Sequence, residues 1–166
     1  MSERLKSVID VSRYIVNKCH DMNISISNLK LQKLLYFAQG YSLAITDKPL
    51  FDEEIEPWDF GPVVPEAYRH YKMYGANEIP RSETYYNIDF DSDHFLELVE
   101  FDDGIFFESE KIIMDAVIGQ FGEFTANYLV TLTHNQSPWR QSYGKLDKIS
   151  KESLCSFFKG YIYNHK

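Results

Sequence analysis

The chain has 166 residues and a formal charge of −8 at pH 7, and 44% of its residues are hydrophobic and 16% aromatic. This length suits a single domain that buries roughly two-thirds of the surface of the unfolded chain. The acidic balance argues against nucleic acid as the main partner, because phosphate binding relies on clustered Lys and Arg, and no run of residues approaches the ~20 apolar positions of a membrane span.

The first predicted element is a helix from about Glu3 to Asp21. Apolar residues recur along one face and charged residues along the other, so we expect it to pack on the core through a single stripe. The same region mixes charged with apolar residues and lacks the unbroken apolar segment of a signal peptide. The positions of the apolar face are Leu5, Val8, Ile9, Ser12, Ile15, Val16, Cys19 and Met22.

Residues 29–41, LKLQKLLYFAQGY, predict a helix that is apolar on most of its circumference and therefore lies at the centre of the fold. Ser27 or Asn28 is expected to cap its start, and the helix should end near Thr46. Gly40 costs roughly 1 kcal/mol relative to alanine inside a helix. We therefore expect another backbone to pack against it.

A narrow polar strip runs along this central helix. Gln32, Tyr36 and Gln39 are spaced i, i+4 and i+7 and share one side, with Lys33 beside them. The residues leave open whether the strip faces a partner or is the solvated edge of a buried helix. All four are candidate partner-binding residues.

Residues 49–68 predict a small β element. Two short extended segments are expected around an acidic turn at 52–54. Because Pro57 and Pro62 withhold backbone donors, any sheet here must be small and at an edge. Gly61 is expected to adopt dihedral angles that are closed to other residues, which makes a stiff bend.

A short helix is predicted over Pro65–Tyr74, with Gly75 directly after its end. Tyr68, Tyr71 and Tyr74 recur every third residue, with basic residues between them. Because the cationic residues are few, this pattern does not favour a nucleic-acid contact. It favours tyrosines that pack on the core while the opposite face of the helix is solvated.

All of the excess negative charge lies between Ser82 and Glu110, a stretch with ten acidic residues and no Lys or Arg. Within it, residues 85–90 predict a strand and residues 94–101 a short helix or strand. The charge either steers a basic protein partner or keeps an irregular surface segment solvated. The acidic candidates for partner binding are Glu83, Asp89, Asp91, Asp93, Asp102 and Asp103.

Three further helices complete the chain. Their expected spans are 108–121, 126–134 and about 150–163, with caps at Glu108 or Ser109, at Thr125 and at Ser150. Residues 137–139 are expected to end the helix predicted over 126–134. The apolar face of the first is expected to comprise Ile112, Ile113, Ala116, Val117 and Gln120. The elements together predict a mainly α fold, a single compact helical domain over residues 1–166 with a small β-hairpin or short sheet element.

The sequence contains no motif for catalysis, cofactor binding or metal binding. The histidines are scattered singly, and Cys19 and Cys155 form no cluster, which suits a reducing cytoplasm. Asp59, Glu66 and His134 can converge only through the fold, and a histidine at a helix end more simply orders its turn by bonding to nearby carbonyls. We therefore predict a cytoplasmic protein with no catalytic residue, no metal and no cofactor.

Three stretches carry a family resemblance: residues 29–41, residues 49–68 (PLFDEEIEPWDFGPVVPEAY) and residues 132–139 (LTHNQSPW). In this order they resemble the Panacea domain, the family of SocA-like antitoxins also known as phage-associated proteins, over about residues 5–143. The resemblance implies a mostly helical domain with a small β element and no chemistry. The matching positions, which it implies are scaffold, are Leu31, Leu34, Leu35, Tyr36, Gly40, Trp58, Gly61, Pro62, Val63, Pro65, Tyr68, His134, Pro138 and Trp139.

The resemblance also implies a function, the protective half of a toxin and antitoxin gene pair. The leading hypothesis is an antitoxin that neutralises a cognate toxin, encoded by the adjacent gene, through direct protein–protein binding. The alternatives are a proteolytic adaptor that delivers the toxin to a protease, a small enzyme acting on a toxin or nucleotide, and a DNA-binding autoregulator, which the acidity disfavours. The acidic stretch is longer than the family's usual connection, so a partner-specific surface can differ there between members.

Overall fold

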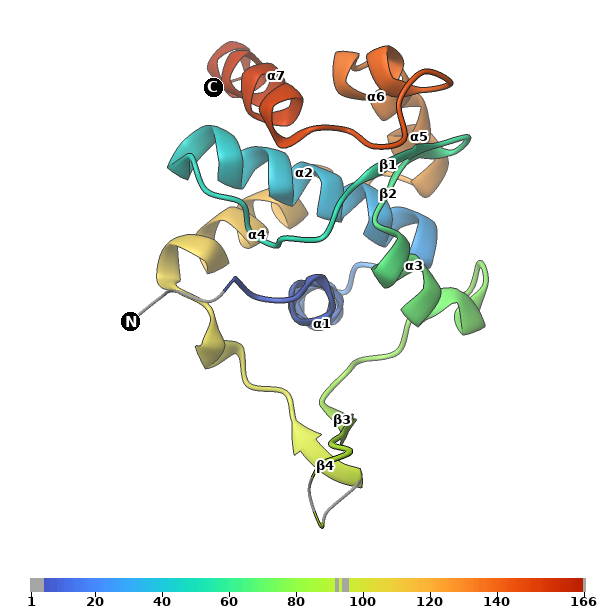
Figure 1. The fold of residues 1–166 in the computed structure, drawn as a ribbon, viewed down its shortest axis with the longest axis vertical. Coiled ribbons are helices and arrows are strands. Elements are labelled where there is room, and N and C mark those ends of the chain that lie inside the picture. Colours follow the sequence, from blue (N-terminus) through green and yellow to red (C-terminus); the bar gives the residue numbers. More distant parts are fainter. Residues whose placement is uncertain (1–4, 92, 94–95, 166) are drawn as a thin grey trace.

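Figure 1 shows the chain as a computed structural model that describes residues 5–91, 93 and 96–165. The described residues form a mainly α domain with two small antiparallel sheets, which confirms the predicted fold class. The elements are α1 (Val8–Asp21), α2 (Asn28–Thr46), β1 (Glu56–Trp58), β2 (Gly61–Val63), α3 (Pro65–Tyr71), η1 (Lys72–Tyr74), β3 (Thr84–Ile88), β4 (Leu96–Glu100), η2 (Asp103–Ile105), α4 (Glu108–Phe121), α5 (Ala126–His134), α6 (Ser137–Ser142) and α7 (Lys151–Asn164).

Helix α2 is the centre of the fold, as its apolar circumference predicts. Figure 1 shows it between α5, α6 and α7 on one side and α1 and α4 on the other. Residues 30–43 are all buried, and the Phe37 ring stacks on Phe121 of α4 with centroids 3.9 Å apart and meets Phe158 of α7 edge-on. One helix therefore joins both layers of the core.

The close approach expected at Gly40 is present, but a ring supplies it and not a backbone. A Cβ atom at Gly40 would lie 2.1 Å from Cδ2 of Phe158, so only glycine fits. The resulting α2–α7 contact brings the last helix onto the central one and offsets the conformational cost of the glycine.

Helix α1 begins at Val8, so the prediction of a start at Glu3 is wrong, and residues 3 and 4 lie outside the described residues. The Ser7 side chain caps the helix by accepting from the Asp10 N–H, and the Glu53 carboxylate accepts from the Val8 N–H at 2.8 Å. A carboxylate from far along the chain thus accepts from a free backbone N–H at the start of the helix. The sequence near the helix start does not predict this contact.

Helix α4 differs from its prediction in two ways. Its N-cap residue is Phe107, whose N–H donates to the Glu110 carboxylate, so neither Glu108 nor Ser109 is its cap. Its apolar face is rotated, because adjacent apolar pairs allow two faces and the contact with α2 selects one: Ile112, Ala116 and Gln120 are exposed, whereas the buried residues are Ile113, Met114, Val117, Ile118 and Phe121.

The first hairpin turns at residues 59–60, so the prediction of a turn at 52–54 is wrong. Strand β1 pairs with β2 in the register Glu56 to Val63, Pro57 to Pro62 and Trp58 to Gly61. The two prolines oppose each other, so the sheet is as small as their missing donors require. Gly61 has φ +99°, the conformation expected of it.

The second hairpin, β3–β4, lies within the acidic stretch. The predicted strand at 85–90 is present as Thr84–Ile88, and the predicted helix or strand at 94–101 is the strand Leu96–Glu100, with residues 94 and 95 outside the described residues. In Figure 1 this hairpin projects from the body beyond α1.

The remaining helix predictions are largely confirmed. Thr125 and Ser150 cap α5 and α7 through their side chains, and α3 continues as η1 to Tyr74 before Gly75 at φ +56°. The predicted break at residues 137–139 is wrong in position: the interruption lies at residues 135–136, and Ser137 already begins α6. Pro138 lies in the first turn of α6, where its missing N–H costs nothing.

Candidate functional site

The polar strip of α2 lies inside the protein. The side chains of Gln32, Lys33, Tyr36 and Gln39 are at most 1% exposed. Neither expectation for the strip, a face available to a partner or a solvated edge, holds for the folded chain, because residues far along the sequence cover these side chains.

Two glutamines of the strip bind the backbone of residues 50–68, which we call the clamped segment. The Gln39 amide oxygen accepts from the N–H groups of Leu50 and Phe51, at 2.8 and 3.3 Å, and its nitrogen donates to the Phe51 carbonyl at 2.8 Å. The Gln32 oxygen accepts from the Val64 N–H at 2.9 Å. Buried backbone groups of Leu50, Phe51 and Val64 are thus satisfied by side chains of α2.

Lys33 and Gly61 form a second contact of the same kind. The Lys33 Nζ donates to the Pro62 carbonyl at 3.1 Å, and burial lowers the pKa of this lysine to about 7. A Cβ atom at Gly61 would lie 2.7 Å from the Lys33 side chain and 2.8 Å from the Thr133 hydroxyl. Glycine is required both by the positive φ and by this close approach.

The region of residues 132–143 closes over the turn of the first hairpin. The Trp139 indole donates to the Trp58 carbonyl at 2.9 Å, and a ring nitrogen of His134 lies 3.0 Å from the Asp59 carbonyl. The His134, Trp139 and Tyr143 rings stack in series, with centroids 4.1 and 4.5 Å apart. His134 thus bonds to a carbonyl of another element, where we expected one near its own helix end.

These contacts bring together the three stretches that carry the family resemblance. Tyr36 of the first stretch donates its hydroxyl to Gln136 of the third at 2.9 Å. Other residues of these two stretches, such as Gln39 and Trp139, bind the backbone of the second. Burial raises the pKa of Tyr36 well above its usual value, which keeps the hydroxyl a donor. Leu31, Leu34 and Leu35 are fully buried on the rest of α2.

Asp59 and His134, two of the three residues considered for catalysis, are neighbours, but they do not form an acid–base pair. His134 meets the backbone carbonyl of Asp59, whereas the carboxylate accepts from the Tyr143 hydroxyl at 2.6 Å. This hydrogen bond and the negative charge raise the pKa of Tyr143. Glu66 is exposed in the first turn of α3, and none of the described contacts joins it to the other two.

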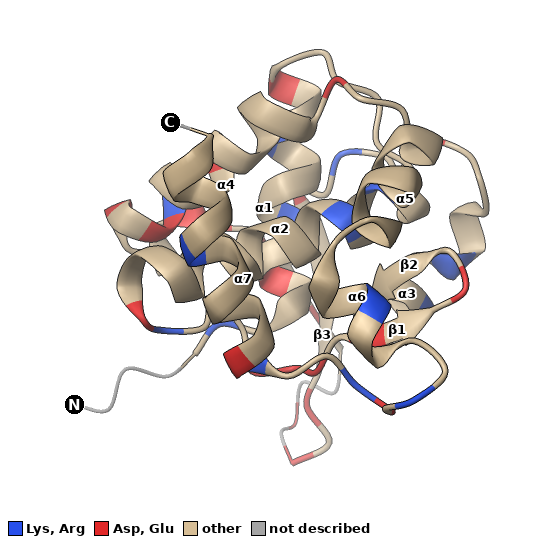
Figure 2. Cartoon of the chain, turned by 90° about the horizontal axis from the view of Figure 1, so that it is seen from above, with Lys and Arg blue, Asp and Glu red and all other residues tan. Residues whose placement is uncertain are grey.

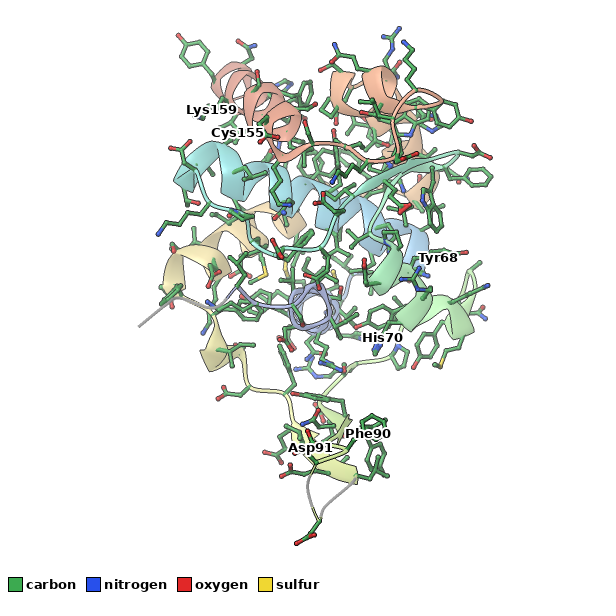
Figure 3. The ribbon with its side chains drawn as sticks, in the orientation of Figure 1. Tyr68, His70, Phe90, Asp91, Cys155 and Lys159 are labelled. Carbon is green, nitrogen blue, oxygen red and sulfur yellow. The ribbon has the colours of Figure 1, made fainter. Side chains whose placement is uncertain are left out.

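A cavity of about 620 Å³ opens beside the first hairpin, between α2 and α3. Its walls include Trp58 and Tyr68, whose rings meet edge-on with centroids 5.1 Å apart. Figure 3 labels Tyr68 on α3. Among the described residues, no group of three or more His, Cys, Asp and Glu side chains is placed to hold a metal ion.

The β3–β4 hairpin, residues 84–100, forms an arm that differs from the rest of the surface. Its Tyr86, Ile88, Leu96 and Leu98 side chains are 53–65% exposed. Figure 3 labels Phe90 and Asp91 at its outer part, away from the helices. Apolar side chains that are exposed together are less common on a small domain than single exposed ones.

The acidic candidates lie on this arm or at its base, and all of them are exposed. At the base, Glu83 pairs with Arg81 at 2.9 Å, Asp103 lies 3.7 Å from Lys111, and the Asp102 carboxylate accepts from the Gly104 N–H. On the arm, Asp89 accepts from the Asp91 N–H. Figure 2 shows basic and acidic positions interspersed over the helices of the body, unlike this stretch. The last acidic candidate on the arm is Asp93.

Within the described part of the chain, no helix is sufficiently long and apolar to span a membrane.

The base of the arm is tied to α1: the Arg13 guanidinium lies 3.6 Å from the centroid of the Tyr85 ring, and the Asn17 side chain bonds to the backbone of Ser82 through both its oxygen and its nitrogen. The arm is thus fixed at its base and open beyond it.

Comparison with known proteins gives two matches. The profile of the family described as "Antitoxin SocA-like, Panacea domain" matches residues 31–140, from the first turn of α2 to α6. The protein named Antitoxin SocA from Caulobacter vibrioides (strain NA1000 / CB15N) is 32% identical over 130 residues, which are 78% of this chain and 66% of that relative. The chain thus spans about two-thirds of that relative's length, and no solved structure matches.

Proposed function

The chain belongs to the family of SocA-like antitoxins with a Panacea domain, and from this membership we propose that it is an antitoxin that neutralises a toxin protein by binding it directly. The observation that carries the proposal is the 32% identity to Antitoxin SocA over 78% of the chain. The proposed toxin is the product of the adjacent gene.

The contacts made by the stretches that carry the family resemblance support binding as the mechanism. Polar side chains within these stretches bind the chain's own backbone: Gln32 and Lys33 bind residues 62–64, and Trp139 binds Trp58. They therefore build a preformed scaffold, and recognition falls to the outer surface. A stable protein interface buries about 1,200 Å² or more in total, and a composition with 16% aromatic residues supplies suitable anchors.

Co-expression with the adjacent gene tests the proposal. We expect the toxin alone to stop growth, the pair to grow, and the two purified proteins to co-elute as one complex. A complex that fails to form, together with no growth rescue, would contradict neutralisation by binding.

The lifetime of the toxin separates binding from delivery to a protease. Direct neutralisation leaves the toxin's half-life unchanged or longer when this chain is present, because the complex protects it. A shorter half-life that requires a cellular protease would instead assign the chain an adaptor role.

A further inference from the structure

The two faces of the arm are unlike. In an antiparallel pair, directly opposed residues point to the same face. Tyr85 and Val99 are opposed and partly buried, and Tyr85 lies under Arg13 of α1, so this is the inner face. The outer face is formed by two apolar pairs, Tyr86 with Leu98 and Ile88 with Leu96, and by one polar pair nearest the base, Thr84 with Glu100.

The outer face is the more apolar of the two, although it is the exposed one. Four of its six side chains are apolar, and each of these is more than half exposed, whereas the inner face pairs Tyr85 with Val99 but also Asn87 with Glu97. A half-buried sheet normally places its apolar residues inward and its polar residues outward. Here the apolar side chains lie on the exposed face instead. Because an isolated two-stranded hairpin is at best marginally stable in water, this arrangement indicates a face that a partner covers.

The charge around the face selects the partner. From Ser82 to Glu110 the chain has ten acidic residues and no Lys or Arg. Nucleic acid and anionic lipid carry the same sign of charge and are repelled. A second copy of this chain would bring two acidic arms together, and like charges across an interface are unfavourable. A basic protein surface is attracted.

Resting on the proposed antitoxin function, we propose that the outer face of the arm, with Tyr86, Ile88, Leu96 and Leu98, is the toxin-binding surface and fits an apolar groove rimmed by Lys and Arg. The apolar side chains supply the buried centre of the interface, where a few residues carry most of the binding free energy. The acidic residues around them supply the polar rim and speed association.

The apolar part of the proposal is tested with the full chain and the purified product of the adjacent gene. The double variant Ile88→Thr with Leu98→Thr keeps residues that favour strands but removes the apolar surface. We expect its Kd to rise by roughly 30-fold or more. The matched control is Ile45→Thr with Leu146→Thr, which changes equally exposed residues on the body (57% and 59%) and should leave Kd unchanged.

The acidic rim is tested separately. Asp91→Asn with Glu100→Gln should lower the association rate at low salt by roughly threefold to tenfold and flatten its salt dependence. Glu123→Gln with Asp147→Asn removes the same charge from exposed positions of the body and should have little effect. Equal effects of the two charge variants would show that net charge alone, and not the arm, attracts the partner.

The outcomes distinguish this inference from the proposed function. If the wild-type chain neither binds the toxin nor rescues growth, the proposed function falls and the inference falls with it. If the wild-type chain does both and the apolar double variant does both equally well, only the inference is overturned. A dimer of the wild-type chain alone that this double variant abolishes would assign the face to a second copy and would also overturn it.

Discussion

The clamped segment and the arm each contain a short antiparallel hairpin and carry aromatic and acidic residues, yet the clamped segment packs on α2 over much of its length, whereas the arm is largely exposed. The difference lies in what meets the backbone. Gln39, Gln32 and Lys33 of α2 bind backbone groups of residues 50–64, whereas α1 anchors the arm near its base. A helix that supplies polar partners turns an irregular segment into part of the core.

The largest loss of stability is expected when the hydrogen bonds from Gln39 to the clamped segment are removed. Gln39→Leu leaves the buried backbone groups of Leu50 and Phe51 without this partner, so we expect the free energy of unfolding to fall by about 3 kcal/mol. Urea denaturation measures it. Gln141→Leu, at an exposed position of α6, is the control and should change the stability by about 0.5 kcal/mol at most. Similar losses for both variants would contradict a clamp.

The contact between α2 and α7 is expected to be nearly as sensitive. Gly40→Ala places a methyl group against the Phe158 ring, and overpacking of this kind costs about 1–3 kcal/mol. Gly160→Ala on α7 meets nothing within 4 Å, so it should stabilise the protein by about 1 kcal/mol through helix propensity alone. A stabilising Gly40→Ala would show that the two helices separate more easily than described.

Lys33, the buried lysine that binds the clamped segment, should make the stability of the protein depend on pH. Its folded-state pKa is about 7, below the ordinary value of 10.5, so between these values the unfolded chain holds a proton that the folded chain has lost, and stability rises with pH. From pH 7 to pH 9 the wild type should gain about 2 kcal/mol relative to Lys33→Met. Parallel pH profiles for the two proteins would contradict a buried, neutral lysine.

The arm should be the least sensitive region. Ile88→Thr with Leu98→Thr removes side chains that are already exposed, so the free energy of unfolding should change by only about 0.5 kcal/mol. Thermal and urea unfolding of the variant beside the wild type measure this. A loss comparable to that of Gln39→Leu would mean that the arm is packed in solution and would remove the contrast between the two regions.

Local signals predicted the helices well. Ser27, Thr125 and Ser150 cap where expected, because an N-cap depends on the side chain and the next few residues only. The central position of α2 followed from its apolar circumference. The start of α1 was missed because its contacts come from Phe51 and Glu53, far along the chain.

The polar strip and the first turn were misread for the same physical reason. Glutamine and lysine at helical spacing look like a solvated face, and only the path of residues 50–64 shows that they bind backbone instead. The acidic residues 52–54 look like a turn, but Glu53 caps α1. The acidic candidates on the arm were exposed as expected, whereas the apolar outer face needed the strand register to be seen.

Amide hydrogen exchange of the full chain, alone and with the product of the adjacent gene, tests the central claim that a preformed scaffold presents the arm to its partner. We predict that exchange slows in residues 84–100 on binding, while the clamped segment, already slow, stays unchanged. Slower exchange in the clamped segment with no change in the arm would contradict the account.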